Sequence, residues 1–433
     1  MKKVRIMNMF RTVCTAYIIC AATQLHAQDF PVIFQHAEIH TGTGAVISNG
    51  MLTMQYGKIT YIGPTIELNG ANANTLIYDM TGKVMYPGMI ALNEQLGLNE
   101  IELVRSTNDM REVGTYNPNV RSLIAFNTDS RVIPTVRSNG IALVQVAPVA
   151  GVISGTSSVM RLNGWNWEDA AVKMDDNMFL NWPAVYAYNY REGRYSVNAD
   201  YPNAVESLLQ FLREAKAYCQ IKQPISDKNL RFEAMRPVFS GEQKIFISAN
   251  YERQIIAAVD MAKTLGIHIV IVGGRESYKV IPLLTDNNIP VLLETTHDLP
   301  LLQQEDVDLP YKLPAMLVHA GVLVGLTLSD EGSSYWNMRN LPYIAGTAAA
   351  YGLTKEEALQ LITINNAKLC GVDAMYGSLE KGKSATFFIS EGDALDMRSS
   401  VVTTIYIDGQ KIDPDNWQNE LAKKYLVKYG IRK

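Results

Sequence analysis

The pattern of hydrophobic positions divides the chain into a β-rich beginning, an alternating middle and a β-rich end. Residues 52–56 and 58–62 alternate apolar and polar side chains with a period of two, and Gly57 joins them. This pattern predicts a β-hairpin. Residues 385–389 and 401–407, near the other end, are again strand-like. We therefore expect β-structure at both ends of the chain.

The middle of the chain alternates apolar runs with stretches of helical periodicity. Predicted strands occupy residues 141–146, 244–248, 267–272, 289–294 and 323–328, and predicted helices occupy 129–140, 203–219, 251–265, 276–286 and 313–320. Strands that are apolar throughout are typical of a parallel sheet covered by helices. We predict an α/β fold with a (β/α)8 TIM-like barrel, and a doubly wound open sheet is the alternative. The Gly- and Ser-rich residues 151–158 are expected to form a loop.

The two β-rich ends are expected to build one small β-sandwich, with the barrel inserted between them. Pro87 and Gly88 interrupt an apolar run and mark the entry into the first barrel strand. The expected boundaries are 28–83 and 380–412 for the β-sandwich, 84–379 for the barrel and 413–433 for a C-terminal helix.

The first 27 residues have the features of a signal peptide. Lys2, Lys3 and Arg5 supply a positive region, residues 12–25 supply an apolar stretch, and Ala27 precedes the expected cleavage point. That stretch is too short to span a bilayer. We expect a periplasmic or secreted protein with no membrane span in its mature chain.

The composition narrows the range of partners and metal sites. A hydrophobic fraction of 47% and a charged fraction of 19% are those of a globular protein. The net charge is −4 and no basic stripe occurs in the sequence, which argues against nucleic acid as a partner. The mature chain keeps Cys219 and Cys370, whose pairing the sequence leaves open. Neither lies in a CxxC or Cys/His cluster, so no structural zinc is expected.

Several motifs together resemble the amidohydrolase superfamily, in particular its imidazolonepropionase-like exported branch. They are Gly57-Lys58-Ile59, the lead from residues 79–83 into Tyr86-Pro87-Gly88, and the stretches 352–359 and 377–385. The resemblance covers nearly the whole mature chain. It implies a barrel with one or two divalent metals at the C-terminal ends of its strands, and hydrolysis of carbon–nitrogen bonds other than peptide bonds.

The positions that the resemblance assigns to metal ligands carry other residues in this sequence. Asn93 and Gln95 stand where the family has His-x-His, and Ser248 and Val272 stand at the ends of two later strands. Amide oxygens bind transition metals poorly compared with imidazole. We therefore expect no metal ligands here, and a zinc-type divalent metal belongs only to a hydrolase interpretation.

Five residues at predicted strand ends are the candidates for chemistry. The resemblance makes Asp330 the catalytic residue, which takes a proton from the attacking water. Asn93, Gln95, Glu294 and His297 are candidates for substrate binding, because barrel enzymes place their sites at the C-terminal ends of strands. The alternatives stay open: Asp330 could cap a helix, and Asn93 and Gln95 could fill a site that has lost its metal.

Two functions follow from these observations. One is an exported hydrolase that acts on carbon–nitrogen bonds of a small molecule. The other is a catalytically inactive pseudoenzyme that serves as a binding or partner subunit, in a homo-oligomer or with a related active amidohydrolase. The absence of His at the expected ligand positions favours the pseudoenzyme, whereas the resemblance in fold is compatible with both functions.

Overall fold

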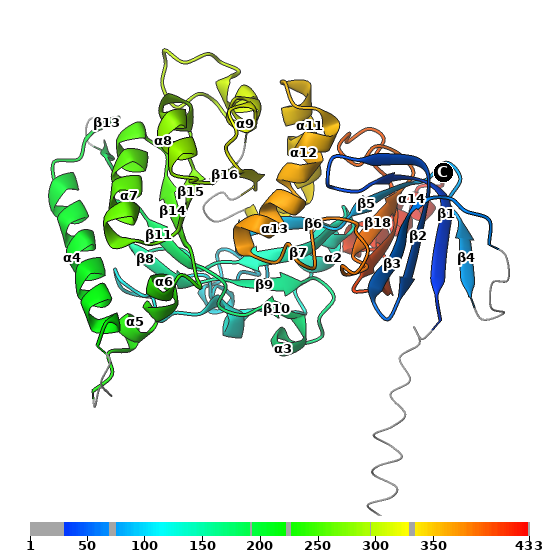
Figure 1. Ribbon diagram of the computed structural model, residues 1–433, viewed down its shortest axis with the longest axis horizontal. Helices are drawn as coiled ribbons and strands as arrows, with labels where there is room; N and C mark the ends of the chain where they lie inside the picture. Colours follow the sequence, from blue (N-terminus) through cyan, green and yellow to red (C-terminus); the bar gives the residue numbers. More distant parts are fainter. Residues whose placement is uncertain are drawn as a thin grey trace, which may run out of the picture.

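The computed structural model describes residues 30–68, 75–190, 193–221, 227–294, 296–328 and 334–431. Figure 1 shows an α/β body, which contains the helices α4 to α9, beside a β-sheet built from both chain ends. The expected signal peptide at residues 1–27 lies outside the described residues. Among the residues described, no helix is long and apolar enough to cross a membrane.

Strands from both ends of the chain form one eight-stranded sheet, as the sequence predicts. Its order is β20-β19-β18-β5-β1-β2-β3, and β4 pairs with β1. The strands are β1 Val32–His40, β2 Val46–Gln55, β3 Lys58–Pro64, β4 Leu76–Asp79, β5 Val84–Pro87, β18 Phe387–Ser390, β19 Val402–Ile407 and β20 Gln410–Ile412. The predicted hairpin is confirmed, since β2 and β3 pair in antiparallel fashion around Tyr56 and Gly57, both of which have positive φ.

The terminal sheet curls over its own apolar core. Phe34 on β1 lies 5.3 Å from the ring of Phe387 on β18 and 5.3 Å from the ring of Tyr406 on β19. β1 and β19 are three positions apart in the sheet order. In a flat sheet that separation would be about 14 Å, because neighbouring strands lie about 4.8 Å apart. The short ring distances therefore require a strongly bent sheet with a separate core.

The α/β body is of the TIM-barrel type, and its strands form two ladders. One has the order β10-β9-β7-β6 and the other β17-β16-β15-β14-β11-β8. Their bounds are β6 Met89–Glu94, β7 Ile141–Val146, β8 Ile153–Thr156, β9 Ser158–Arg161, β10 Ala171–Lys173, β11 Met178–Asn181, β14 Ile245–Ala249, β15 Ile269–Gly273, β16 Val291–Leu293 and β17 Val324–Leu326. β6 pairs with β7 in parallel, and β11, β14, β15, β16 and β17 form a continuous parallel run.

The expectation of a loop at residues 151–158 is wrong. These residues form β8 and the start of β9, which pair antiparallel with β11 and β7 respectively. Gly155 has a φ of +133°, and a Cβ on it would lie 2.5 Å from the carbonyl oxygen of Val120. Gly155 is thus needed because the strand packs closely against the backbone of Val120, and not because the chain forms a loop there.

Side chains connect β6 to β17, where no backbone ladder joins the two sheets among the described residues. The amide of Asn366 donates to the carbonyl oxygens of Ile90 on β6 (2.7 Å) and Leu326 on β17 (2.9 Å). Thr327 Oγ1, just after β17, donates to the Leu92 carbonyl oxygen at 2.5 Å. These bonds hold the first and last barrel strands next to each other.

Helices follow the strands much as the periodicity predicts. They are α2 Val132–Arg137, α3 Trp167–Ala170, α4 Tyr201–Cys219, α5 Leu230–Glu233, α6 Arg236–Ser240, α7 Glu252–Leu265, α8 Ile281–Asp286, α9 Leu309–His319, α10 Ser334–Asn337, α11 Leu341–Ala350, α12 Lys355–Leu361, α13 Ile364–Cys370 and α14 Trp417–Lys428. Local chemistry sets several ends. Thr354 and Glu357 form a reciprocal capping box before α12, and Gly266, with a φ of +65°, ends α7.

His40 connects the terminal sheet to the barrel helices. Its imidazole contacts Glu356 on α12 at 2.5 Å and Glu38 on β1 at 3.1 Å, and it stacks on Tyr86. Burial of the ring lowers the pKa of His40, but the hydrogen bonds with Glu356 and Glu38 outweigh this effect and raise it overall. The protonated imidazole therefore stabilises this junction.

We predict that Asn366→Leu, which keeps the volume but removes both hydrogen bonds, lowers the free energy of unfolding by about 2 kcal/mol. Urea denaturation followed by circular dichroism measures the change. Asn203→Leu at the exposed start of α4 is the control and should cost at most about 0.5 kcal/mol. Equal losses in the two variants would show that the β6–β17 connection does not limit stability.

We also predict a pH-dependent stability from His40. A raised folded-state pKa adds stability that is fully present below the ordinary value of 6.5 and is lost as the pH rises through the folded-state pKa. The stability difference between the wild-type chain and His40→Gln should therefore shrink when denaturation is measured at progressively higher pH. His319→Gln on α9 is the matched exposed control. A difference that grows with pH is incompatible with this assignment.

Candidate functional site

The end of the first barrel strand carries three buried polar side chains. Asn93, Glu94 and Gln95 are 7%, 0% and 2% exposed. Asn93 has a φ of +55°, a conformation that asparagine tolerates better than most residues. Its backbone N–H donates to Gln145 Oε1 at 3.3 Å, and Gln95 Nε2 donates to the Asn93 carbonyl oxygen at 3.4 Å. The backbone thus turns sharply at Asn93, near the end of β6.

A buried chain of hydrogen bonds, centred on Asp176, supports this turn at Asn93. Gln145 on β7 donates through Nε2 to Asp176 Oδ2 at 2.6 Å, Ser157 Oγ donates to Asp176 Oδ1 at 2.5 Å, and Asn177 Nδ2 donates to Asp176 Oδ2 at 2.6 Å. Burial raises the pKa of the Asp176 carboxyl, and the hydrogen bonds from Ser157 and Gln145 oppose that shift. The chain links Asn93 to the segment that precedes β11.

Glu94 is held by the segment that follows β17, the other neighbour of β6. Thr327 Oγ1 lies 3.2 Å from Glu94 Oε1, and the same hydroxyl bonds the Leu92 carbonyl oxygen. The first strand end is therefore fixed by β7 on one side and by the segment after β17 on the other.

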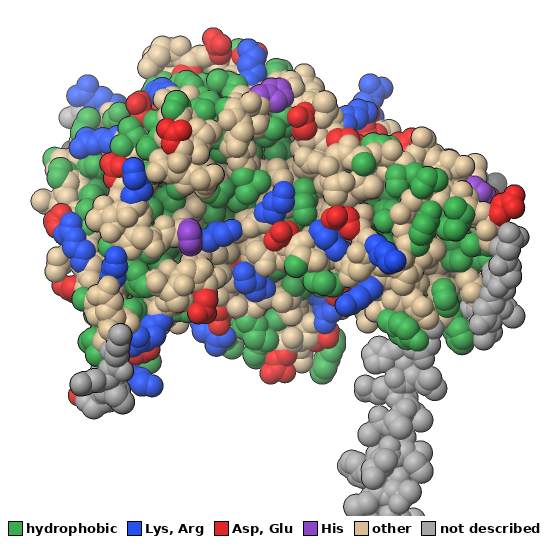
Figure 2. All heavy atoms as spheres, in the orientation of Figure 1, with side chains coloured by type: hydrophobic (Ala, Val, Ile, Leu, Met, Phe, Trp, Pro, Cys, Tyr) green, Lys and Arg blue, Asp and Glu red, His purple; other side chains and the backbone are tan. Residues whose placement is uncertain are grey.

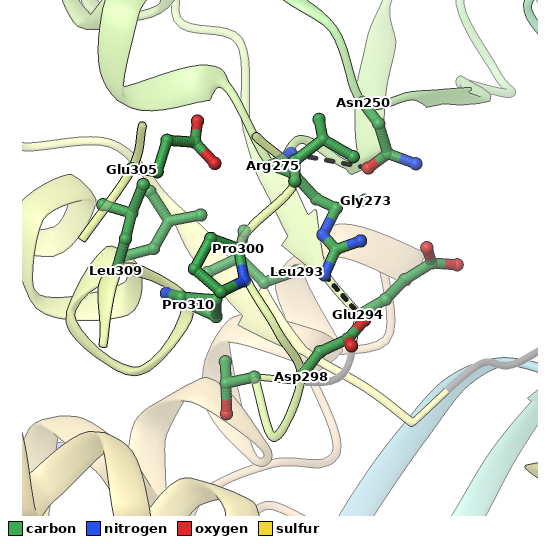
Figure 3. Close-up of a pocket in the computed structure, with 13 residues that line it drawn as sticks. Asn250, Gly273, Arg275, Leu293, Glu294, Asp298, Pro300, Glu305, Leu309 and Pro310 are labelled. Atoms are coloured by element: carbon green, nitrogen blue, oxygen red, sulfur yellow. Dashed lines mark hydrogen bonds and ion pairs between the residues drawn. The ribbon is translucent and has the colours of Figure 1, made fainter. Parts of the chain in front are cut away.

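A cavity of about 200 Å³ opens at the C-terminal ends of β14, β15 and β16. The residues that line it are Asn250, Gly273, Arg275, Leu293, Glu294, Thr296, Asp298, Pro300, Leu301, Glu305, Leu309, Pro310 and Leu313. Figure 3 shows that its polar residues come from separate loops that follow these strands. Such strand ends are where barrel proteins bind ligands.

Arg275 orders the rim of this cavity. Its Nη2 donates to Asp298 Oδ2 at 2.6 Å and to the Leu299 carbonyl oxygen at 2.8 Å, and its backbone N–H donates to Asn250 Oδ1 at 3.4 Å (Figure 3). Gly273 has a φ of +84°, and a Cβ on it would lie 2.4 Å from that same Asn250 oxygen. A glycine is therefore needed for the loops after β14 and β15 to meet.

The structure places the predicted site residues in different surroundings. Glu294 lines the cavity, whereas Asn93 and Gln95 lie at the end of β6 and are not among the described residues that line it. His297 is exposed, and its Nε2 lies 2.6 Å from Thr347 Oγ1 on α11. Partial burial of the ring lowers the pKa of His297 from its ordinary value of 6.5. Asp330 lies outside the described residues.

Other residues of the site were not predicted from the sequence. Asn250, Arg275, Thr296, Asp298 and Glu305 line the cavity. Asn250 and Arg275 come just after β14 and β15, and this position is the one signal that would have pointed to them. The buried Asp176 gave no signal, because it lies in an ordinary polar stretch with Asp175 and Asn177.

The donor set at the strand ends does not fit a zinc-type metal. Asn93 and Gln95 offer amides, Ser248 offers a hydroxyl, and Val272 offers no donor atom. Within the described part of the chain, no group of three or more His, Cys, Asp or Glu side chains is arranged to hold a metal ion. Zinc binds thiolate, imidazole and carboxylate groups, so the residues described here do not form such a site.

Comparison with known proteins relates the chain to amidohydrolases. Residues 311–412 match the model of the Amidohydrolase family. An imidazolonepropionase from Flavobacterium psychrophilum is 27% identical over 113 residues, which make up 24% of this chain and 27% of that protein. The chain thus aligns with well under two thirds of that relative's length.

Solved structures share the fold over most of the chain. An amidohydrolase from Thermotoga maritima MSB8 superposes with a TM-score of 0.76 at 24% identity, covering 88% of this chain and 99% of that one. A prolidase complexed with N-methylphosphonate-L-proline gives a TM-score of 0.55 at 15% identity, with 88% and 99% covered. Residues 311–412 are thus similar to the Amidohydrolase family, a stretch of 113 residues is similar to an imidazolonepropionase, and the chain shares the TIM-barrel-type fold of these solved structures.

Proposed function

We propose that this protein is an exported amidohydrolase-family pseudoenzyme, which binds a small molecule at the barrel mouth without metal-activated hydrolysis. The observation that carries the proposal is the donor set at the strand ends. Asn93, Gln95 and Ser248 offer neutral oxygen and nitrogen groups, and Val272 offers none. In metal-dependent hydrolysis of a carbon–nitrogen bond, the metal ion lowers the pKa of its bound water, so that hydroxide is available at neutral pH. A site without imidazole or thiolate ligands holds such an ion weakly.

The geometry of the mouth supports ligand binding. The cavity beside β14, β15 and β16 has a rim fixed by Arg275, and Glu294 at the end of β16 is among the residues that line it. Asn93 and Gln95 are held by buried hydrogen bonds rather than left to solvent. A binding site needs groups that are positioned in advance, because ordering them costs affinity. On this proposal Glu294 contacts a ligand in the cavity, whereas Asn93, Gln95 and His297, which do not line the cavity, would contribute from other parts of the barrel mouth.

A second candidate is a hydrolase of non-peptide carbon–nitrogen bonds. The family match over residues 311–412 favours it, because this segment contains Asp330, the residue that the resemblance assigns to proton transfer. In such an enzyme Asp330 would take a proton from the attacking water. The described strand ends do not supply the usual ligands for a metal that would activate that water.

The proposed loss of metal chemistry also suggests a protein partner. A fold kept without its metal chemistry suits a subunit that pairs with a related active amidohydrolase, or with a second copy of itself. Positive and negative side chains are interspersed on the face that Figure 2 shows, without a continuous basic stripe on the described residues of that face. This distribution does not favour nucleic acid as a partner.

The proposal that the protein is exported is based on the basic and apolar residues 1–27, with cleavage expected after Ala27.

We predict that the untagged protein, purified without chelators, contains far less than one equivalent of zinc, manganese or iron. It should also turn over neither linear nor cyclic amides. Elemental analysis by mass spectrometry and a chromatographic substrate screen measure the two properties. Stoichiometric metal together with amide hydrolysis that disappears in Asp330→Ala would establish the hydrolase instead.

A restoration experiment tests the identity of the two replaced positions. The double variant Asn93→His/Gln95→His should raise zinc affinity by about tenfold or more, because imidazole is a far better zinc ligand than an amide. His also tolerates the positive φ at position 93. Lys58→His/Thr60→His, at two exposed positions of β3, is a control pair with the same spacing, away from the barrel mouth. Equal zinc binding by the two variants would mean that the end of β6 is not a former metal site.

A further inference from the structure

The α/β body also carries a two-stranded hairpin that belongs to neither of its ladders. β12 Tyr186–Asn189 and β13 Arg194–Val197 follow β11, and among the described strands they pair only with each other. Figure 1 shows β13 at the end of the α/β body that lies away from the terminal sheet. An isolated two-stranded hairpin is marginally stable in water, and a further strand stabilises it.

One face of this hairpin carries aromatic side chains. Side chains two positions apart in a strand point to the same side, so Tyr186 and Tyr188 on β12 share a face. Their partners across the hairpin, Val197 and Tyr195, lie on that face too. Tyr188 lies 5.1 Å from the ring of Tyr195 and 5.0 Å from the ring of Tyr190, just after β12. These five residues are called the tyrosine face below.

The tyrosine face is open to solvent over most of its extent. Tyr190, Tyr195 and Val197 are 89%, 70% and 68% exposed. With about 200 Å² for each tyrosine side chain, the face exposes about 500 Å² in one copy of the chain. Two such faces together reach the total of about 1,000 Å² that a specific protein interface needs. The face is therefore large enough to join two copies.

The outer edge of β13 presents backbone groups in a defined register. The Asn198 N–H donates to the Val185 carbonyl oxygen at 2.8 Å, which makes these two residues a hydrogen-bonded pair at the base of the hairpin. Hydrogen-bonded and non-hydrogen-bonded pairs alternate along an antiparallel ladder. The N–H and C=O groups of Tyr195 and Val197 therefore point away from β12, toward a side where the described residues supply no strand.

A second copy of β13 fits this edge in the antiparallel direction. With a two-fold axis at Ser196, Tyr195 of each copy would pair with Val197 of the other through backbone hydrogen bonds. Ser196 would face its own counterpart, and Arg194 would face Asn198 of the second copy. No like charges meet across this junction, and β13 contains no proline or lysine of the kind that protects exposed edge strands.

The ring geometry favours a protein partner over a planar ligand. The Tyr188 ring makes angles of 87° with Tyr190 and 64° with Tyr195. Rings set edge to face are typical of packed aromatic side chains. They do not form the flat platform on which a base stacks.

We propose that this hairpin is a dimer interface, in which β13 of two copies pairs edge to edge and creates one four-stranded sheet with a continuous tyrosine face. The inference rests on the partner role in the proposed function and identifies its surface. An active hydrolase could dimerise in the same way. Metal content and turnover therefore test the proposed function, whereas the state of association tests the interface.

Sedimentation velocity of the mature protein over a wide range of concentrations should show a reversible equilibrium between monomer and dimer. Tyr195→Lys places a charge on the tyrosine face, and Val197→Pro removes an N–H that points away from β12. Each should raise the dissociation constant of the dimer by about tenfold or more. Tyr56→Lys, at a similarly exposed tyrosine between β2 and β3, is the matched control and should associate like the wild-type chain. Thermal unfolding establishes that every variant is folded.

The register predicts one specific cross-link. Opposed residues of a non-hydrogen-bonded pair have Cα atoms about 4.5 Å apart, within the range that a disulfide spans. Ser196→Cys should therefore form a covalent dimer with oxidised glutathione as the oxidant. Arg194→Cys, on the same side of β13, would lie about 13 Å from its counterpart and should not. Non-reducing electrophoresis measures the dimer, and the wild-type chain with Cys219 and Cys370 gives the background.

Each other result has a distinct meaning. A wild-type chain that stays monomeric at every concentration would overturn the interface. A dimer that Tyr195→Lys and Val197→Pro leave unchanged would place the contact elsewhere and also overturn it. Equal cross-linking of Ser196→Cys and Arg194→Cys would contradict the two-fold pairing of β13. Metal-dependent amide hydrolysis by a dimer that Tyr195→Lys dissociates would contradict the pseudoenzyme and support the interface.

Discussion

The connection between β6 and β17 is the constraint on which the barrel mouth depends. The two strands come from the beginning and the end of the barrel sequence, and the amide of Asn366 bonds a carbonyl oxygen of each. Thr327 adds a bond from the segment after β17 to the backbone of β6. Because these bonds fix the first strand against the last, the end of β6 has one defined position relative to the other strand ends. This position also fixes where Asn93 and Gln95 lie at the barrel mouth.

The polar groups at the end of β6 are therefore well ordered. Asn93 is tied through Gln145 to the buried Asp176, and Glu94 is tied to Thr327. Keeping such groups buried is costly unless all of them are paired, and a fully paired network makes the local structure unique. The structure thus retains a stiff strand end while its donor atoms are unsuited to zinc. On the proposed function, this rigidity would hold the binding groups in place before a ligand arrives.

Most of the fold could be predicted from the sequence, because each buried strand and each amphipathic helix has its own local pattern. The apolar runs at 141–146 and 244–248 became β7 and β14 within one residue, and both chain ends joined one sheet. The strand at 153–156 was missed, because Gly155 serves close packing within it and looks like a loop residue in the sequence.

The candidate site was much less predictable. Of the cavity lining only Glu294 was identified, since it ends a recognisable strand. Arg275, Thr296 and Glu305 lie in loops, and a single sequence does not show which loops meet. The burial of Asp176 depends on contacts with Gln145 and Ser157, which are 31 and 19 residues away in the chain. Local patterns therefore describe the barrel, whereas the chemistry of its mouth depends on long-range contacts.

On the proposed function, the strand ends of this barrel do not hold a catalytic metal. Anomalous X-ray diffraction at the zinc absorption edge, from crystals grown with added zinc, tests it most directly. We predict no anomalous peak beside Asn93, Gln95 and Ser248. A strong peak there, with protein ligands at about 2.0–2.3 Å, would contradict the account and restore the metal-dependent hydrolase.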